Sequence, residues 1–232
     1  MPNRIIGILG GMGPEATADF FREIIRLTPA KKDQDHIPVL IYSDPRVPER
    51  TQAILHGGEN PTPYLIKAAV TLENAGAGIL AMPCNTAHYF LARLRAEVRI
   101  PILDMIEETY RSVRSQIGNA KSVGLLATKG TILSGVYRDV FSRHGLEILV
   151  PEASDQERLQ QAIFQIKAGS YERARQDTFE KIGSTLIAAG AKAVILGCTE
   201  IPLGFDVDRV DYPVVNATRV LAQAAVDWAL GK

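Results

Sequence analysis

Residues 4–17 have the sequence RIIGILGGMGPEAT. Its first six residues are almost all apolar, which is typical of a strand buried on both faces. The glycines that follow allow a tight turn, and Pro14 suits the first position of a helix because its missing N–H has no partner there in any case. The stretch therefore predicts a buried strand, a glycine loop and a helix, the repeating unit of an α/β fold.

The same alternation continues along the chain. Further strands are predicted at residues 39–43, 78–82, 100–103, 122–127, 146–150, 193–196 and 212–215. Helices are predicted at residues 61–75, 87–98, 155–168, 171–189 and 217–230, with one more after Met105 and another ending at His144. This alternation indicates parallel sheets covered by helices on both faces.

The second half of the chain resembles the first. Gly7-Ile8-Leu9 with Gly13 matches Gly124-Leu125-Leu126 with Gly130, and a Gly-Ala pair precedes Cys84 and Cys198 by one common interval. Such features occur in many α/β units, but their nearly equal offsets along the chain favour duplication. We therefore expect two pseudo-symmetric, doubly wound parallel-sheet domains with an interdomain cleft. The expected domains are residues 1–104 plus 211–232, whose last strand and helix return to the first sheet, and residues 105–210.

The composition is that of an ordinary globular enzyme. Of 232 residues, 46% are hydrophobic, and 26 Lys and Arg balance 26 Asp and Glu. No basic excess points to nucleic acid or an anionic membrane, and no apolar run is long enough to span a bilayer. The N-terminus lacks the pattern of a signal peptide, and two cysteines are too few for a disulfide scaffold. We expect a cytoplasmic protein with free thiols.

Cys84 and Cys198 each follow a predicted buried strand, in equivalent places of the two halves. Ligands of open α/β sheets bind at the carboxyl ends of the strands. Two thiols facing a ligand from opposite sides suit stereoinversion, in which one thiolate removes a proton and the other thiol delivers one. Either cysteine alone is more simply a buried apolar residue. A disulfide is disfavoured in a reducing compartment, and the cysteines with His88 lack the spacing of a structural zinc site.

Gly11-x-Gly13-x-x-Ala16 also has the form of a dinucleotide-binding fingerprint, with Asp44 placed as a ribose-binding acid. An NAD-binding oxidoreductase is therefore an alternative. Glu15 in the first helical turn opposes a pyrophosphate, and the motif alone is weak. A loop that approaches a small anionic ligand, or a simple tight turn, explains the glycines equally.

Three segments, GGMGPEAT at 10–17, PCNTAH at 83–88 and GCTE at 197–200, together resemble the aspartate/glutamate racemase superfamily. The similarity is closest to its aspartate racemase branch, spans Ile5 to Ala217 and includes TPAKKDQ at 28–34. It implies two pseudo-symmetric α/β domains, no pyridoxal phosphate or other cofactor, no metal, and the homodimer common among related enzymes.

The resemblance also implies a site. Cys84 and Cys198 would be the acid and base, and Asn85, Thr86 and Thr199 would bind the α-carboxylate and ammonium groups. Arg50 and Lys167 match residues that hold the substrate's side-chain carboxylate. Met12, Ala87 and Glu200 complete the candidate substrate-binding set. Glutamate racemases have His where this chain has Glu200, which favours aspartate.

Simpler interpretations of these residues stay open. Arg50 is otherwise a loop residue in a surface ion pair, and Lys167 a cation at a helix C-terminus. His88 either tunes the thiol or, more simply, is a core or capping residue. Asp104, Glu107 and Glu108 are best interpreted as a solvated first helical turn.

The function predicted is cofactor-independent racemisation of a small acidic amino acid, most simply aspartate. The alternatives are a glutamate or broad-specificity amino-acid racemase, a maleate isomerase or hydantoin racemase, the oxidoreductase, and a binding module without catalysis.

Overall fold

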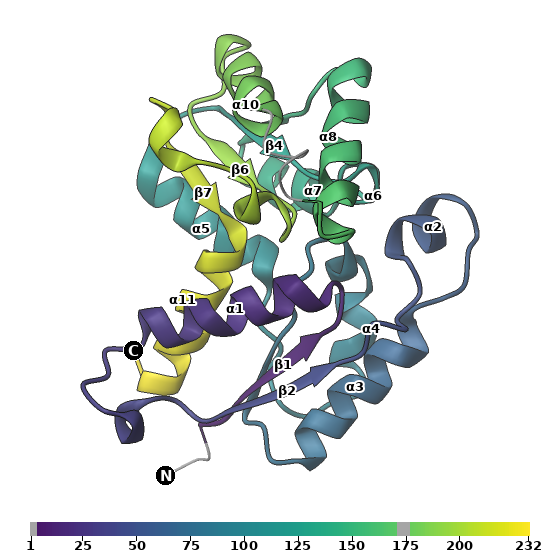
Figure 1. The fold of residues 1–232 in the computed structure, drawn as a ribbon, viewed down its shortest axis with the longest axis vertical. Coiled ribbons are helices and arrows are strands. Elements are labelled where there is room, and N and C mark those ends of the chain that lie inside the picture. The colour runs from purple at the N-terminus through teal and green to yellow at the C-terminus, as the bar shows by residue number, and fades with distance from the viewer. Residues whose placement is uncertain (1–3, 171–176) are drawn as a thin grey trace. The chain divides into compact units, whose positions relative to one another are not determined.

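A computed structural model of the chain describes residues 4–170 and 177–232. The chain divides into two compact units, Met1–Glu108 with Thr218–Lys232, and Thr109–Ala217. Two helices carry the chain between the units, α5 (Met105–Ile117) and α11 (Ala217–Leu230) (Figure 1).

The first unit begins with the strand, glycine loop and helix that residues 4–17 predict. Its elements are β1 (Ile6–Gly10), α1 (Pro14–Leu27), η1 (Asp33–Asp35), β2 (Val39–Ser43), α2 (Arg50–Leu55), α3 (Thr62–Asn74), β3 (Ile79–Ala81), η2 (Thr86–Phe90) and α4 (Leu91–Arg95), where η marks a 3₁₀ helix. The strands form a parallel sheet of order β2-β1-β3, and Ile102 adds a parallel bridge to Leu80 of β3.

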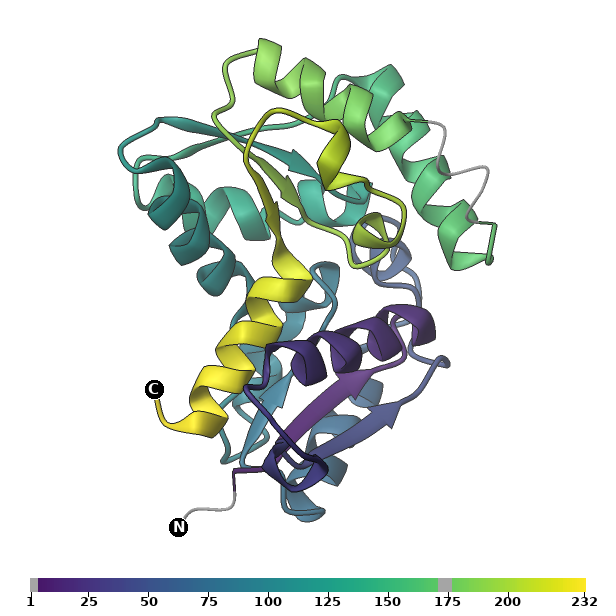
Figure 2. The ribbon, with the colours of Figure 1, turned by 60° about the vertical axis from the view of Figure 1, so that its left-hand side comes forward.

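Both faces of β1 are covered, as its continuous apolar sequence predicts. Leu9 belongs to a core cluster with Leu65 and Leu72 of α3. On the other face, Gly10 lies so close to Thr17 of α1 that a Cβ there would overlap the threonine side chain. Helix α11 lies beside α1 (Figures 1 and 2), and Arg219 of α11 pairs with the buried Glu23 of α1. This unit is therefore doubly wound.

The second unit repeats the plan. Its elements are β4 (Ser122–Leu126), α6 (Lys129–Leu133), α7 (Val136–Ser142), β5 (Glu147–Leu149), α8 (Ala153–Lys167), α10 (Thr178–Ala188), β6 (Val194–Leu196), η3 (Ile201–Leu203), η4 (Val207–Arg209) and β7 (Val214–Asn216). Its parallel sheet has the order β5-β4-β6-β7. Helices α8 and α10 lie side by side (Figure 2) and pack on β4 and β6 through Leu126, Leu159, Ile163, Phe179, Ile182 and Leu196. The predicted α/β class with two parallel sheets is confirmed.

The last strand, β7, belongs to the second sheet and not to the first, where the sequence analysis placed it. β7 pairs with β6 of the second sheet, with Val194 opposite Val214 and Leu196 opposite Asn216. The expectation that residues 212–215 complete the first sheet is wrong. In the first sheet, Ile102 occupies the corresponding place beside β3, so the two sheets are more alike than expected.

Several helices also differ from the prediction. The segment at 87–98 is η2 followed by the short α4, and the helix ending at His144 is two helices, α6 and α7. They separate at Gly135, whose φ of +75° is left-handed. Helix α2 was not predicted. Of the helix predicted at 171–189, residues 171–176 lie outside the described residues, and α10 accounts for the rest.

None of the helices in the described part of the chain is both long enough and apolar enough to cross a membrane.

Candidate active site

Cys84 lies just beyond the carboxyl end of β3, in a buried loop. Its side chain is 6% exposed and belongs to the core cluster of the first unit. The Cys84 N–H donates to the Met82 carbonyl at 2.8 Å, and η2 begins two residues later. Asn85 and Thr86, at the start of η2, are buried beside it. The structure thus brings a thiol, an amide and a hydroxyl together at one strand end.

The His88 side chain bridges the Cys84 loop and the start of α5. Its Nδ1 lies 2.9 Å from the Cys84 carbonyl oxygen, and its Nε2 lies 3.1 Å from the main-chain nitrogen of Met105. A carbonyl only accepts and an N–H donates, so Nδ1 carries the proton and Nε2 accepts. Burial lowers the pKa of His88, which favours this neutral form. Both ring nitrogens are therefore engaged in structure, which supports the simpler interpretation of His88.

Cys198 has the equivalent place in the second unit, just beyond the carboxyl end of β6. Its Sγ donates to Oε2 of Glu200 at 3.0 Å, and the Thr199 hydroxyl donates to the same oxygen at 3.2 Å. All three residues are buried: Cys198 is 7% exposed, Thr199 2% and Glu200 3%. Burial raises the pKa of the Cys198 thiol well above its usual range, the Glu200 carboxylate raises it further, and Lys167 lowers it.

Two threonines at the carboxyl end of β4 were not singled out from the sequence. Thr128 caps α6 by accepting from the Thr131 N–H, and the two hydroxyls lie 3.0 Å apart. β4 is hydrogen-bonded to β6, so this capping pair lies on the same sheet edge as Cys198. The signal was available: Gly124-Leu125-Leu126 matches Gly7-Ile8-Leu9, so the loop after β4 corresponds to the glycine loop.

Gln156 of α8 was also missed. Its Nε2 donates to the Ala127 carbonyl at 2.9 Å, which ties α8 to the end of β4. Its Oε1 is buried and has no hydrogen-bond partner among the described residues. No pattern in the sequence distinguishes this glutamine from its neighbours in α8.

Arg50 is the first residue of α2 and is buried, with 7% exposure. Its Nη1 donates to the carbonyls of Val47 and Pro48, both at 3.2 Å. Its Nε is buried without a hydrogen-bond partner, and no carboxylate of the described residues lies within ion-pair distance. Helix α2 contacts η2, the segment that follows Cys84. The alternative of a surface ion pair does not fit a buried guanidinium without an acidic partner.

Lys167 is the last residue of α8 and is exposed, with its ammonium 5.7 Å from the centre of the Phe164 ring. It is near enough to Cys198 to lower the pKa of that thiol. Met12 and Ala87, by contrast, are buried in the apolar cluster that contains Cys84.

The glycine loop is largely closed on itself. Thr17 Oγ1 accepts from the Gly11 N–H and donates to the Gly13 carbonyl, both at 2.9 Å. Asp44 is held by Arg46, whose Nε and Nη2 donate to the two carboxylate oxygens. This pairing lowers the pKa of Asp44 to about 2. A bound dinucleotide would need the Gly11 N–H and the Asp44 carboxylate, but both are hydrogen-bonded within the protein. This counts against the oxidoreductase interpretation.

Asp104, the first residue of the acidic cluster after β3, has a structural role. Asp104 Oδ1 accepts from the main-chain nitrogens of Ile106 and Glu107, which caps α5. Within residues 4–170 and 177–232, no group of three or more His, Cys, Asp or Glu side chains is arranged to hold a metal ion.

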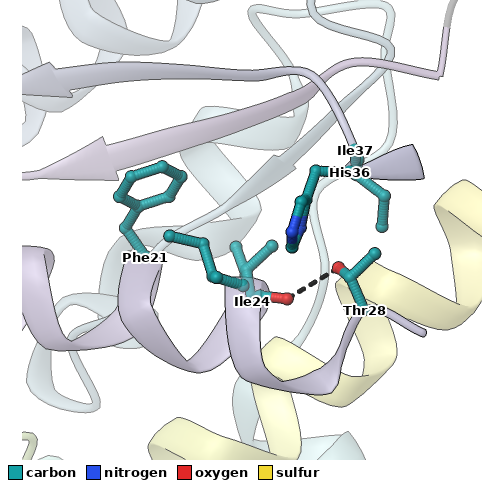
Figure 3. Close-up of a pocket in the computed structure, with 6 residues that line it drawn as sticks. Phe21, Ile24, Thr28, His36 and Ile37 are labelled. Carbon is teal, nitrogen blue, oxygen red and sulfur yellow. Dashed lines mark hydrogen bonds between the residues drawn. The ribbon is translucent and has the colours of Figure 1, made fainter. Parts of the chain in front are cut away.

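A cavity of about 230 Å³ lies elsewhere in the first unit, between the C-terminal half of α1 and the segment before β2 (Figure 3). Phe21, Ile24, Ile25 and Ile37 make it largely apolar, and the Thr28 hydroxyl donates to the Ile24 carbonyl. Because α1 follows the carboxyl end of β1, its last turns lie at the amino end of the strands. The cavity is therefore at the opposite end of the sheet from Cys84.

Comparisons with known proteins agree with this geometry. The family described as Asp/Glu/Hydantoin racemase matches residues 9–225. The broad specificity amino-acid racemase RacX of Bacillus subtilis is 29% identical over 97% of this chain and 98% of its own. The structure is similar to the aspartate racemase of Picrophilus torridus, with a TM-score of 0.87, 29% identity, and 97% and 94% of the two chains covered. It is also similar to an aspartate racemase homologue of Pyrococcus horikoshii, with a TM-score of 0.80, 27% identity, and 98% and 99% covered.

Proposed function

The chain belongs to the Asp/Glu/Hydantoin racemase family, and from that premise we propose that it interconverts L- and D-aspartate without a cofactor, with Cys84 and Cys198 as acid and base. One observation carries the proposal. In each unit a buried cysteine follows the strand that pairs with the unit's first strand, β3 beside β1 and β6 beside β4, and hydroxyl or amide side chains lie next to that cysteine in the sequence. The sheet orders β2-β1-β3 and β5-β4-β6 make these two positions topologically equivalent.

The proposed chemistry uses one thiol on each face of the substrate's Cα atom. A thiolate takes the α-proton, and the other thiol gives a proton to the opposite face. Asn85, Thr86 and Thr199 offer hydrogen bonds to the substrate's α-carboxylate and ammonium groups, which would stabilise the carbanion-like transition state. This step requires no electron sink beyond those polar contacts.

Arg50 supports an acidic substrate. A buried guanidinium without a carboxylate partner is costly, because the charge has lost water and gained only two carbonyl contacts. A substrate carboxylate would supply the missing charge and accept from the guanidinium fork. Lys167, the exposed last residue of α8, is the second cation proposed for that carboxylate.

A broad-specificity racemase is the second candidate. The similarity to RacX of Bacillus subtilis extends over nearly the whole of both chains, and the name of that protein describes broad specificity. The two candidates differ in whether a neutral amino acid is turned over as well as an acidic one.

The test is chiral chromatography of aspartate, glutamate and alanine incubated with the purified chain. The chain is first dialysed against EDTA and treated with hydroxylamine. We expect L- and D-aspartate each to reach an equal mixture, with alanine converted far more slowly and a Cys84→Ser/Cys198→Ser double variant inactive. Equal rates on alanine favour the broad-specificity candidate. Activity that returns only with pyridoxal phosphate, NAD or zinc contradicts cofactor independence.

A further inference from the structure

The two thiols have different surroundings. Two residues after Cys198 stands Glu200, whose carboxylate accepts from the thiol at 3.0 Å. Two residues after Cys84 stands Thr86, and no carboxylate of the described residues is hydrogen-bonded to Cys84 Sγ. The cysteines are otherwise similar, with exposures of 6% and 7%. The two halves of the fold therefore match in topology but differ in charge.

From this contact we propose that Glu200 is a positioning residue that holds the proton on Cys198 Sγ, so that the resting enzyme presents Cys198 as the acid of the pair. A donor must carry a proton, so an ionised Glu200 and the 3.0 Å contact together require Cys198 to be a thiol. Loss of that proton would leave two negative groups in a buried site, which is strongly unfavourable.

The charges that act on Cys198 come from its own loop and from α8. The carboxylate of Glu200 opposes ionisation, whereas the Glu200 main-chain N–H and the Lys167 ammonium favour it. The Thr199 hydroxyl donates to the same carboxylate oxygen, which helps to hold the Glu200 carboxylate toward the thiol. Burial acts in the same direction as the carboxylate.

The consequence for the reaction rests on the proposed function. With Cys198 as the acid, Cys84 is the base that takes the Cα proton of one enantiomer, and Cys198 gives its proton to the opposite face. Cys84 is then a thiol, and Cys198 is a thiolate beside Glu200. Repulsion between these two anions favours return of a proton to Cys198 from water, with loss of the proton on Cys84. The same repulsion limits how long the enzyme stays in the form that accepts the other enantiomer.

The direct test needs no substrate. In a Cys84→Ser background Cys198 is the only thiol, because the chain has two cysteines. Its ionisation is followed by thiolate absorbance and by the pH dependence of alkylation with iodoacetamide. Glu200→Gln removes the charge but keeps the size and the main-chain N–H. We expect it to lower the pH midpoint of Cys198 by about one unit or more.

Glu180→Gln is the matched control, since Glu180 is a buried carboxylate of the same unit that accepts instead from the Asp206 N–H at 2.8 Å. It should leave the midpoint unchanged. An unchanged or higher midpoint in Glu200→Gln overturns the proposal. If Glu200→Gln does not fold, mass spectrometry of the alkylated parent chain is the second measurement, and a Cys198 midpoint at or below the usual value of about 8.5 overturns the proposal.

Racemisation is a separate measurement. If the chain is a racemase, the alkaline limb of kcat/KM, which reports the essential acid, should move to lower pH in Glu200→Gln by the same amount as the thiol midpoint. A chain that shows the thiol shift but no racemisation contradicts the proposed function alone. A racemase with no thiol shift contradicts the role of Glu200 alone.

Discussion

Arg50→Ala separates substrate recognition from stability. Arg50 contributes two hydrogen bonds to the carbonyls of Val47 and Pro48, but it also keeps a charge buried without an acidic partner. Loss of the hydrogen bonds and relief of the buried charge oppose each other, so we expect the free energy of unfolding to stay within about 2 kcal/mol of the parent value.

Turnover of aspartate should respond far more strongly. Removing one member of a buried charge-assisted contact costs about 2–5 kcal/mol, which corresponds to a loss of about 30- to 5,000-fold in kcat/KM. Any residual turnover of alanine, which lacks a side-chain carboxylate, should change little. The assay is chiral chromatography of both amino acids over a range of concentrations, with urea unfolding of the same preparations.

Arg46→Ala is the matched control. Arg46 is an arginine of the same loop, but it is exposed and its guanidinium is paired with Asp44. Its removal should leave aspartate turnover close to that of the parent chain. Equal losses on aspartate and alanine in Arg50→Ala would refute the reasoning, because Arg50 would then serve folding or the α-carboxylate.

Two further predictions concern stability. His88→Ala leaves the Cys84 carbonyl and the Met105 N–H without their partner, so it should lower the free energy of unfolding by roughly 2 kcal/mol or more, measured in urea. Folding lowers the pKa of His88, so the contribution of His88 to the free energy of unfolding should be complete above about pH 6.5 and decline as the pH falls below that value. The His88→Ala variant should lack this part of the pH dependence. Gly11→Ala, at φ +93° with Asp44 main-chain atoms 2.4 Å from the new Cβ, should cost roughly 2 kcal/mol or more. Gly57→Ala, at φ +64° in open space, should cost only about 1 kcal/mol, and equal costs would contradict the steric argument.

The sequence predicts the fold well where local pattern is strong. β1, β2, β4 and β6 are short apolar runs followed by turn residues, so their positions follow from the chain itself. The partner of β7 does not, although β7 is the next strand after β6, because either sheet offers an edge and the apolar pattern of residues 212–215 suits both. Helix α2 has only six residues and no apolar periodicity to reveal it.

The candidate site shows the same limit. The places of Cys84 and Cys198 at strand ends follow from strand prediction and the internal repeat. Two features do not: the contact between Cys198 and Glu200, and the unpartnered Nε of Arg50. Both depend on where a side chain points and on what surrounds it, and residue type alone leaves these undetermined.

The central claim is that two thiols divide the two directions of one reaction. The most direct test is solvent-deuterium exchange at Cα of L- and D-aspartate, followed by NMR, with Cys84→Ser and Cys198→Ser. Each variant should lose racemisation, because a hydroxyl is a far weaker acid and base than a thiol near neutral pH. Each should still exchange the Cα proton of one enantiomer through its remaining cysteine, and the two variants should favour opposite enantiomers. Exchange should be the slower in Cys84→Ser, because Glu200 holds the proton on Cys198. Exchange of the same enantiomer by both variants, or full racemisation by either, would contradict the account.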